Sequence, residues 1–475
     1  MSPTGTVYLA FLLIAVAAYR LTGGVRRFHL ATILLLSFLF YASWNPVYCV
    51  PLAVTAMLDF NTARYVSRRR GRRAARVALA ADIAANLCIL AAFKYFNFMA
   101  DNAVALASAI GYSLPPVPIR VVFGVGISFY TFQSMSYVID VHRGDAEPAR
   151  SFADYLAFVA FFPTLLAGPI TRASVLLPQL ERPAPPITAE QGGRALFLIA
   201  LGFIKKIVVA DYLAVNLVNR VFELPGMYSS AELLAGIYGY AAQIYCDFSG
   251  YSDIAIGSAL LLGIGLKDNF NAPYRSRDLP EFWRRWHISL STWLRDYLFF
   301  SLPKNRSSKW APYFNTLVTF ALGGLWHGAS WTFLAWGALH GTGLAVARFF
   351  DVRRPRGRNA KPVPRWRQFA GVFVTFHFVC LTWVFFRCDS VDQAFGVLQG
   401  LGRLSGNAAN ITWPIAGLTL AGIVLQWLPE TVFPRLQARF IALPSPVQCA
   451  LLAGTAVAVA RVSGSSVSQF IYFNF

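Results

Sequence analysis

Long runs of apolar residues, separated by short polar stretches, recur along almost the whole chain. A helix needs about 20 mostly apolar residues to cross a hydrocarbon core of roughly 30 Å. Several of the runs are short or contain Gly and Pro, as in tilted or re-entrant helices. The pattern predicts an all-α integral membrane protein with about 11 transmembrane helices plus re-entrant and interfacial helices. The predicted apolar segments are Val7–Ala18, Leu30–Leu52, Val77–Phe93, Leu196–Ala210, Leu233–Ile244, Ile254–Ile264, Tyr313–Leu322, Trp331–Val346, Phe369–Phe386, Ile415–Leu428 and Val447–Val462.

The composition agrees with this pattern, because 56% of the 475 residues are hydrophobic and only 13% are charged. A soluble protein carries about twice that charged fraction. The first apolar segment has no basic start and is followed by more membrane sequence, so we expect a membrane helix there rather than a secretory signal peptide. No linker separates soluble domains and no tandem repeat is visible, so residues 1–475 are predicted to form a single polytopic domain.

A net charge of +20 would suit a nucleic-acid-binding protein, but the positive residues gather in short loops between apolar segments. Short loops rich in Lys and Arg stay on the cytoplasmic side of a bacterial inner membrane. The clusters at 20–27 and 64–76 are separated by a hydrophobic hairpin that turns at Ser43–Pro46, and those at 353–367 and 435–439 by a second out-and-back pair. Clusters separated by an even number of membrane crossings lie on the same side, and this arrangement predicts that both termini are extracytoplasmic. Because the topology accounts for the positive charge, nucleic acid is an improbable partner.

Familiar soluble-enzyme motifs are missing from the chain. There is no P-loop, no H-E-x-x-H, no G-x-S-x-G and no dinucleotide-binding G-x-G-x-x-G. The six cysteines form no C-x-x-C pair and are interpreted as core residues, so neither a disulfide framework nor a metal site is expected. Chemistry therefore has to come from polar residues inside membrane sequence, which are concentrated between about residues 240 and 345.

His327 lies in the run Gly-Gly-Leu-Trp-His-Gly-Ala-Ser-Trp, residues 323–331. The small residues are expected to leave space beside the imidazole, and the rings of Trp326 and Trp331 could wall that space. Histidine can accept and return a proton near neutral pH. A structural histidine, hydrogen-bonded between helices, is the competing interpretation.

His287 lies in the segment 280–297, where Trp283, Trp286 and His287 share one face of a helical wheel while Arg284, Arg285 and Arg295 lie on the other side. This predicts an amphipathic helix lying flat at the membrane surface, with Trp at headgroup level and Arg toward water. Such a helix either buries its histidine against protein or turns it inward toward His327.

The run Tyr245–Asp253 places the carboxylates of Asp247 and Asp253 inside apolar sequence. A buried carboxylate needs a partner, most simply an Arg or a His, so structural pairing competes here with catalysis. The remaining histidines are interpreted as structural or interfacial: His29, His142, His340 and His377.

Taken in order, several runs resemble the membrane-bound O-acyltransferase superfamily, in the bacterial branch that acylates alginate and teichoic acid. They are Tyr41–Pro46, Lys94–Phe98, Gly126–Tyr137, Phe162–Arg172, Tyr245–Gly257, Asn271–Tyr297, Gly324–Gly337, Trp383–Arg387 and Phe470–Phe475. The run around His327 is more similar to the alginate-acetylating members than to the D-alanyl ones.

The resemblance implies a ring of tilted helices around a central tunnel, with His327 catalytic and His287 at the position of a second family histidine. It implies an acyl thioester, acetyl-CoA or an acyl carrier protein, as a cytoplasmic donor substrate rather than a bound cofactor. A hydroxyl of an extracytoplasmic polysaccharide or envelope polymer would be the acceptor, with a periplasmic or extracellular acyltransferase as partner. The tunnel would be lined by Trp283, Trp286, Asp247, Trp326 and Ser330.

Two classes of function remain open from the sequence. The first is O-acyl transfer, with acetyl as the expected group and D-alanyl as the alternative. The second is transport of a polar lipid or glycan, which could also use intramembrane His and Asp. Transporters usually contain internal repeats, and their absence here favours the acyltransferase.

Overall fold

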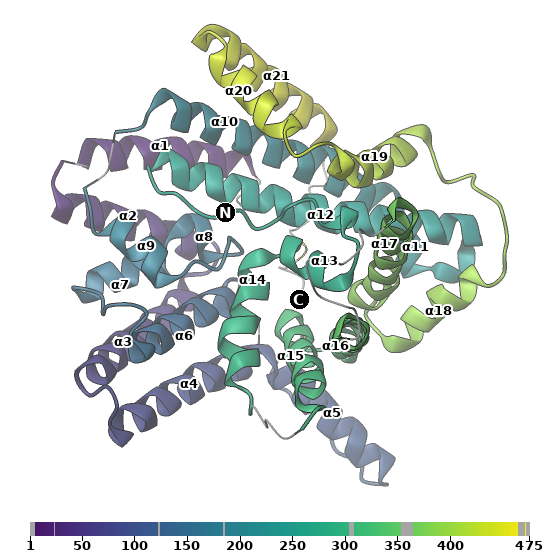
Figure 1. The fold of residues 1–475 in the computed structure, drawn as a ribbon, viewed down its shortest axis with the longest axis horizontal. Helices are drawn as coiled ribbons and strands as arrows, with labels where there is room; N and C mark the ends of the chain where they lie inside the picture. The colour runs from purple at the N-terminus through teal and green to yellow at the C-terminus, as the bar shows by residue number, and fades with distance from the viewer. Residues whose placement is uncertain are drawn as a thin grey trace. The chain divides into compact units, whose positions relative to one another are not determined.

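A computed structural model describes residues 5–22, 24–121, 124–183, 186–303, 308–352, 364–463 and 471. These residues form helices and connecting segments without any β-strand, which confirms the all-α prediction (Figure 1). The α-helices are α1 Thr6–Thr22, α2 Arg26–Ala42, α3 Cys49–Arg68, α4 Arg73–Lys94, α5 Phe96–Ala109, α6 Ile127–Arg143, α7 Phe152–Val159, α8 Phe162–Leu165, α9 Ala173–Leu180, α10 Ala189–Phe203, α11 Asn219–Glu223, α12 Ser230–Leu261, α13 Leu279–Arg285, α14 Ile288–Trp293, α15 Ala311–His327, α16 Trp331–Val352, α17 Arg365–Arg387, α18 Val391–Leu401, α19 Trp413–Val424, α20 Val432–Ala442 and α21 Ser445–Ser463. Helices of the wider π type follow α10 at Ile204–Asp211 and α14 at Leu294–Leu298.

The chain divides into two compact units, of which the first comprises residues 1–195 and 255–267 and the second residues 196–254 and 268–475. The prediction of a single domain stays a prediction. In the first unit α6 is the core helix, because every residue from Ile127 to Val141 is buried and α3 and α4 pack on it. Its polar side chains find partners within this unit; for example, the Gln133 amide donates to the carbonyl of Phe158 at 2.7 Å.

In the second unit α15 and α16 form the most closely packed helix pair, and α16 also packs on α13 and α17. Glycines allow this approach. A Cβ atom built on Gly324 would lie 2.2 Å from the carbonyl oxygen of Phe333, and one on Gly337 would lie 2.2 Å from that of Phe320. Small residues at helix contacts let backbones approach in this way in membrane proteins. Because α15 ends at His327, this contact fixes the position of that histidine.

Several predicted segments correspond to observed helices, with two differences. The segment Leu30–Leu52 is two helices, since α2 ends at Ala42 and α3 begins at Cys49, which confirms the predicted turn at Ser43–Pro46. The two segments predicted within 233–264 are instead one helix, α12, of 32 residues. The polar stretch between them stays helical because its carboxylates are paired with lysines, so it has no need to turn toward water.

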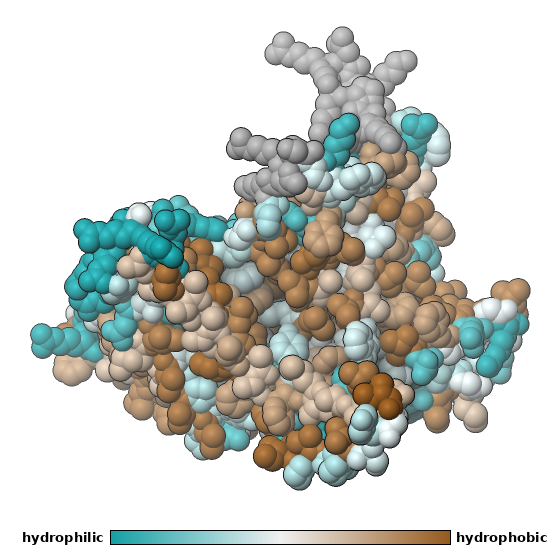
Figure 2. Space-filling model, turned by 90° about the horizontal axis from the view of Figure 1, so that it is seen from below, coloured by the Kyte–Doolittle hydropathy of each residue, from teal (hydrophilic) through white to brown (hydrophobic). Residues whose placement is uncertain are grey.

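Within the described ranges, three helices are long and apolar enough to cross a membrane: Arg73–Lys94, Arg365–Arg387 and Ser445–Val462. A fourth span is possible if Trp413–Trp427 and Val432–Ala442, which meet at 97°, act as one broken span. The predicted number of about 11 spans is therefore unconfirmed. Figure 2 shows apolar residues in brown across much of the visible face, with hydrophilic residues in teal mainly toward its edges, as expected for a membrane protein.

The densest arginine cluster lies where it was expected, between two apolar helices, because Arg68 ends α3 and Arg73 begins α4. The 20–27 cluster lies at the junction of α1 and α2. Residues 353–363 of the third cluster lie outside the described residues, as does most of the closing run Phe470–Phe475.

Candidate active site

The segment around His287 is not the continuous amphipathic helix that we predicted. It is broken between α13 and α14, and His287 at the break has a left-handed backbone with φ of +41°. Main-chain bonds from a preceding segment hold the break open: Asn271 N–H donates to the Arg285 carbonyl, and Ile288 N–H donates to the Asn269 carbonyl, each at 2.9 Å. A helical-wheel pattern cannot reveal such bonds, because it records only local periodicity.

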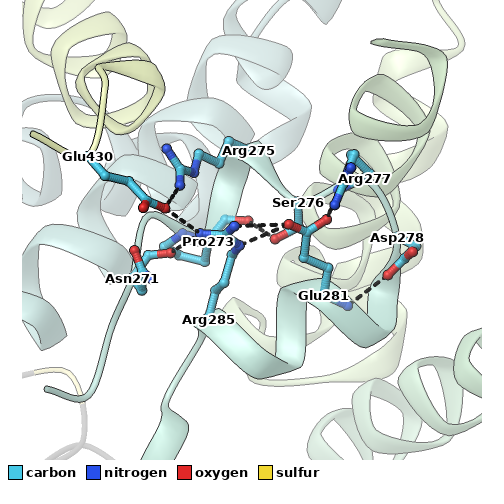
Figure 3. A network of polar contacts seen from close by, with 9 residues as sticks. All are labelled: Asn271, Pro273, Arg275, Ser276, Arg277, Asp278, Glu281, Arg285 and Glu430. Atoms are coloured by element: carbon cyan, nitrogen blue, oxygen red, sulfur yellow. Dashed lines mark hydrogen bonds and ion pairs between the residues drawn. The ribbon is translucent and has the colours of Figure 1, made fainter. Parts of the chain in front are cut away.

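A polar network fixes α13 in front of this break (Figure 3). Asp278 caps the helix by accepting from Glu281 N–H at 2.7 Å. The Glu281 carboxylate accepts from both Arg277 and Arg285 at 3.0 Å. Burial raises the pKa of Glu281, but the hydrogen bonds from Arg277 and Arg285 outweigh it, so that the pKa lies below its usual value. Arg285 is thus turned toward Glu281 with 19% of its side chain exposed, whereas Arg284 is exposed.

Aromatic rings surround His327, which is buried with 3% of its surface exposed. Its ring centroid lies 5.0 Å from that of Trp326, 5.1 Å from Trp336 and 5.3 Å from Phe386. The predicted wall of Trp326 and Trp331 is thus half right, because Trp331 begins α16 and is 56% exposed. The flanking glycines also differ from expectation. A Cβ on Gly328 would lie 2.1 Å from the Phe333 ring. The space beside this glycine is therefore filled by a neighbouring side chain and is not empty.

The structure brings the two candidate histidines together inside the second unit. Their ring centroids are 6.5 Å apart, and His287 is fully buried. Phe248 of α12 packs edge-on against His287 at 4.6 Å, and Trp326 lies within 6.3 Å of the same ring. Burial lowers the pKa of His287 to about 3, so its imidazole is neutral near pH 7.

The other predicted site residues have more varied surroundings. Trp283 and Trp286 are buried at 6% and 1% exposure, so their rings pack against protein. Their position at headgroup level stays a prediction. Trp283 donates to His340 Nδ1 at 3.3 Å, and His340 Nε2 bonds to the Thr382 hydroxyl at 2.9 Å. Both nitrogens of His340 are therefore engaged, as the interpretation of a structural histidine requires.

Asp247 is held in an ion-paired cluster. Its Oδ1 lies 2.7 Å from Lys206 Nζ, which is also 2.7 Å from Asp211 Oδ1, and its Oδ2 accepts from Ile471 N–H at 2.8 Å. Lys205 pairs with Asp253 at 2.7 Å. The partners are lysines, not the Arg or His expected from the sequence, because the π-helical segment presents two adjacent lysines to α12.

Ser330 stands at the start of α16, where its hydroxyl oxygen accepts from Thr332 N–H at 3.1 Å and bonds to the Thr332 hydroxyl at 2.8 Å. This is the geometry of a helix N-cap. Whether Ser330 or Asp247 also contacts substrate stays a prediction.

A cavity of about 1090 Å³ lies beside the histidine pair, between α13, α14, α15, α16 and α17. Its wall is mainly apolar, with Trp283 and Ile288 on the side toward the histidines, and four arginines line it: Arg277, Arg284, Arg295 and Arg348. Neither histidine lines it. Trp336 lies 5.9 Å from Trp283 and 5.1 Å from His327, so one indole ring separates the cavity wall from that histidine. The predicted cavity at His327 itself stays a prediction.

Comparison with known proteins identifies the family of this chain. Residues 121–388, which include α6 to α17 and both histidines, match the membrane-bound O-acyltransferase family. The chain belongs to that family. It is 39% identical over 431 residues to the probable alginate O-acetylase of Pseudomonas aeruginosa, with 89% of this chain and 79% of that protein covered.

Two further relatives act on other polymers, as their names state. The chain is 32% identical to the peptidoglycan O-acetyltransferase of Helicobacter pylori over 79% of this chain and 74% of that protein. It is 31% identical to the teichoic acid D-alanyltransferase of Streptococcus thermophilus over 55% of this chain and 68% of that protein. The protein is therefore a membrane acyltransferase, and the interpretation as a transporter is not supported.

Sequence reasoning missed several residues of this region. Trp336 and Phe386 contact His327, and both lie in runs that carried the family resemblance, so a search of those runs for aromatics would have found them. Asn269 contacts His287 but lies two residues before the quoted run. Its burial is visible only in the structure, so the sequence carried no signal that distinguished Asn269 from a loop residue.

Proposed function

We propose that this protein transfers an acyl group, acetyl in the simplest case, from a cytoplasmic thioester to a hydroxyl of an extracytoplasmic polysaccharide or envelope polymer. The observation that carries this proposal is the buried pair of histidines, 6.5 Å apart and enclosed by aromatic rings, in a chain of an acyltransferase family. His327 serves as the main base, and His287 assists proton transfer or positions the thioester.

The chemistry requires little beyond proximity and a base. The acceptor oxygen attacks the thioester carbonyl while His327 takes the hydroxyl proton. A new C–O bond forms, the C–S bond breaks, and the thiol leaves as the imidazolium returns a proton to sulfur. Water would compete with the acceptor, so the aromatic enclosure by Trp326, Trp336 and Phe386 protects the thioester.

The arginine-lined cavity suits the donor. Acetyl-CoA and acyl carrier proteins both deliver the thioester on a long phosphopantetheine arm, and positive side chains attract its phosphate. We place the arm against the apolar wall at Trp283 and the phosphate among Arg284, Arg295 and Arg348. Trp336 then has to move, or the arm has to pass beside it, for the thioester to reach His327.

The arginine clusters support a proposal for the orientation in the membrane. We propose an inner-membrane location with the α3–α4 turn in the cytoplasm and both termini outside it. An extracytoplasmic acyltransferase partner would then receive or redirect the acyl group. D-alanyl transfer from a carrier protein is the second candidate, favoured by the similarity to a teichoic acid D-alanyltransferase.

The test uses purified full-length protein in nanodiscs, supplied with acetyl-CoA and an alginate oligosaccharide, with free thiol and acetylated product measured together. His327→Ala is expected to reduce transfer by about 10³-fold and His287→Ala by about 10–100-fold. A parallel reaction with a D-alanyl carrier protein distinguishes the second candidate.

The matched control is His377→Ala, because His377 bonds to Tyr238 and to the Phe373 carbonyl and lies outside the histidine pair. It should transfer acetyl at the parent rate. Parent-level transfer by a folded His327→Ala protein would show that another group is the base.

A further inference from the structure

Asn269, on the segment that precedes α13, lies in space beside the break between α13 and α14 and contacts His287. We propose that Asn269 is a positioning residue, which fixes the orientation and tautomer of His287 so that Nδ1 carries the hydrogen and Nε2 carries the lone pair. The proposal rests on the proposed function in so far as His287 serves acyl transfer.

The contacts of Asn269 converge on the break. It is 1% exposed. Its main-chain carbonyl accepts from Ile288 N–H at 2.9 Å, and its Oδ1 accepts from Ser289 N–H at 3.1 Å and from the Ser289 hydroxyl at 2.9 Å. The same Oδ1 lies 3.3 Å from His287 Nδ1. Asn269 thus bonds to the backbone of the two residues that follow His287, and it also contacts the His287 ring.

The hydrogen-bond pattern determines the direction of each bond. A main-chain N–H can only donate, so the atom of Asn269 that faces Ser289 N must be the amide oxygen. The amide nitrogen then faces the Ser252 hydroxyl, at 3.4 Å. The Ser289 hydroxyl also lies 3.5 Å from His287 Nδ1, but its one hydrogen is donated to Asn269 Oδ1 at 2.9 Å. An amide oxygen can only accept, so His287 Nδ1 supplies the hydrogen of its bond to Asn269. The neutral imidazole has one hydrogen, and Nε2 is therefore its acceptor nitrogen.

This arrangement has a chemical consequence. A histidine whose Nδ1–H is bonded to an oxygen acceptor is held in one orientation and one tautomer, and its Nε2 is made a better base. His287 has a left-handed backbone conformation, which is uncommon outside glycine and needs support from neighbouring groups. The bonds to Ile288 and Ser289 stabilise it. Asn269 therefore acts through His287 and needs no contact with substrate.

The experiment measures both rate and tautomer on the full-length protein in nanodiscs. Asn269→Ala should lower kcat for acetyl transfer by about 10–100-fold with KM nearly unchanged. Asn269→Asp keeps an oxygen acceptor and should recover most of that rate. Asn271→Ala is the matched control, because Asn271 lies two residues further along the chain and its side chain is exposed. The substitution keeps the main-chain bond to Arg285, so the rate should not change.

The tautomer is read by ¹⁵N NMR of histidine-labelled protein, where the signals lost in His287→Ala identify His287. The parent should show an Nδ1–H signal that changes in Asn269→Ala and persists in Asn269→Asp. An Nε2–H tautomer in the parent, or an unchanged signal and rate in Asn269→Ala, would overturn the proposal. If Asn269→Ala does not fold, the parent tautomer and Asn269→Asp still decide it.

The two proposals can fail separately. Adding Asn269→Ala to His287→Ala should cause little further loss of rate, because the asparagine acts through the histidine. Parent-level transfer by His287→Ala refutes the role of His287 in the proposed function, whereas the NMR result tests the positioning by itself.

Discussion

Two polar regions are buried in the second unit, and adjacent residues of α12 contribute to both. Asp247 belongs to a charged region, where it pairs with Lys206, and Phe248 packs on His287 in a neutral region. The charged region consists of ions that compensate one another over distances of 2.7 Å. The neutral region consists of imidazoles in contact with aromatic rings. Buried charge here stabilises a fold, and the groups suited to chemistry are uncharged.

The reason lies in the cost of burying charge. An ion removed from water needs a close counter-ion and is then held rigidly by it, so it is poorly suited to exchanging protons. A neutral imidazole has a much smaller desolvation cost and keeps a lone pair for a substrate proton. Mutations in the charged region should therefore lower stability more than activity, and mutations that displace the neutral region should lower activity.

The largest expected effect is on stability, in the charged region. Lys206→Met leaves the carboxylates of Asp211 and Asp247 without their shared cation, and breaking such a buried pair costs about 3–5 kcal/mol. We expect a marked fall in the thermal midpoint of the detergent-solubilised protein, measured by fluorescence-detected size exclusion. Activity per folded molecule should stay near that of the parent.

Adding Asp247→Asn to Lys206→Met is the control, because it removes one of the two stranded charges and should recover part of the stability. A stable Lys206→Met protein that has lost acetyl transfer would contradict the purely structural role of the charged region, because Lys206 would then take part in the chemistry.

The second prediction concerns packing behind the neutral region. Gly324→Ala forces α15 away from α16, because its Cβ would lie 2.2 Å from the Phe333 carbonyl oxygen. Overpacking of this kind costs about 1–3 kcal/mol. Since α15 ends at His327, a shift of about 1 Å there could lower the transfer rate by about 10²-fold. Kinetics and thermal unfolding of the same preparation test both effects.

Gly417→Ala is the matched control, because no atom lies within 4 Å of its added Cβ. It should leave both the transfer rate and the thermal midpoint close to those of the parent. An equally harmless Gly324→Ala would show that the close contact does not hold the histidine in place.

The smallest expected effect is at Glu281, whose charge braces α13 next to the neutral region. Glu281→Gln should cost about 1 kcal/mol at pH 7, because both arginine partners retain some access to water. The folded-state pKa of Glu281 lies below its ordinary value of 4.5, so its charge stabilises the fold above that pH. The stability difference between parent and variant should therefore shrink as the pH falls below 4.5. A difference that grows in acid would contradict the assigned direction.

The sequence predicted what depends on composition and local pattern. Apolar runs predicted an all-helical membrane protein, and the turn at Ser43–Pro46 was found where polar and turn-forming residues interrupt such a run. The family runs indicated His287 and His327, which the fold brings together although 40 residues separate them.

What the sequence could not reveal depends on contacts between distant segments. The break at His287 depends on main-chain bonds to residues 269 and 271, which leave no periodic signal. The lysine partners of Asp247 and Asp253 lie in another segment, the π-helix of residues 204–211, and nothing in the local pattern shows that this segment faces α12. For the same reason Trp336 replaces Trp331 beside His327, since helix orientation determines which indole turns inward.

The adjacency of Asp247 and Phe248 also limits how this protein can change during evolution. Neighbouring residues on an α-helix point about 100° apart, so inserting or deleting one residue upstream in α12 would rotate both side chains out of their regions together. Substitutions can be compensated one at a time, but a change of length there cannot. The number of residues from the start of α12 to Phe248 should therefore vary less among descendants than the residues themselves.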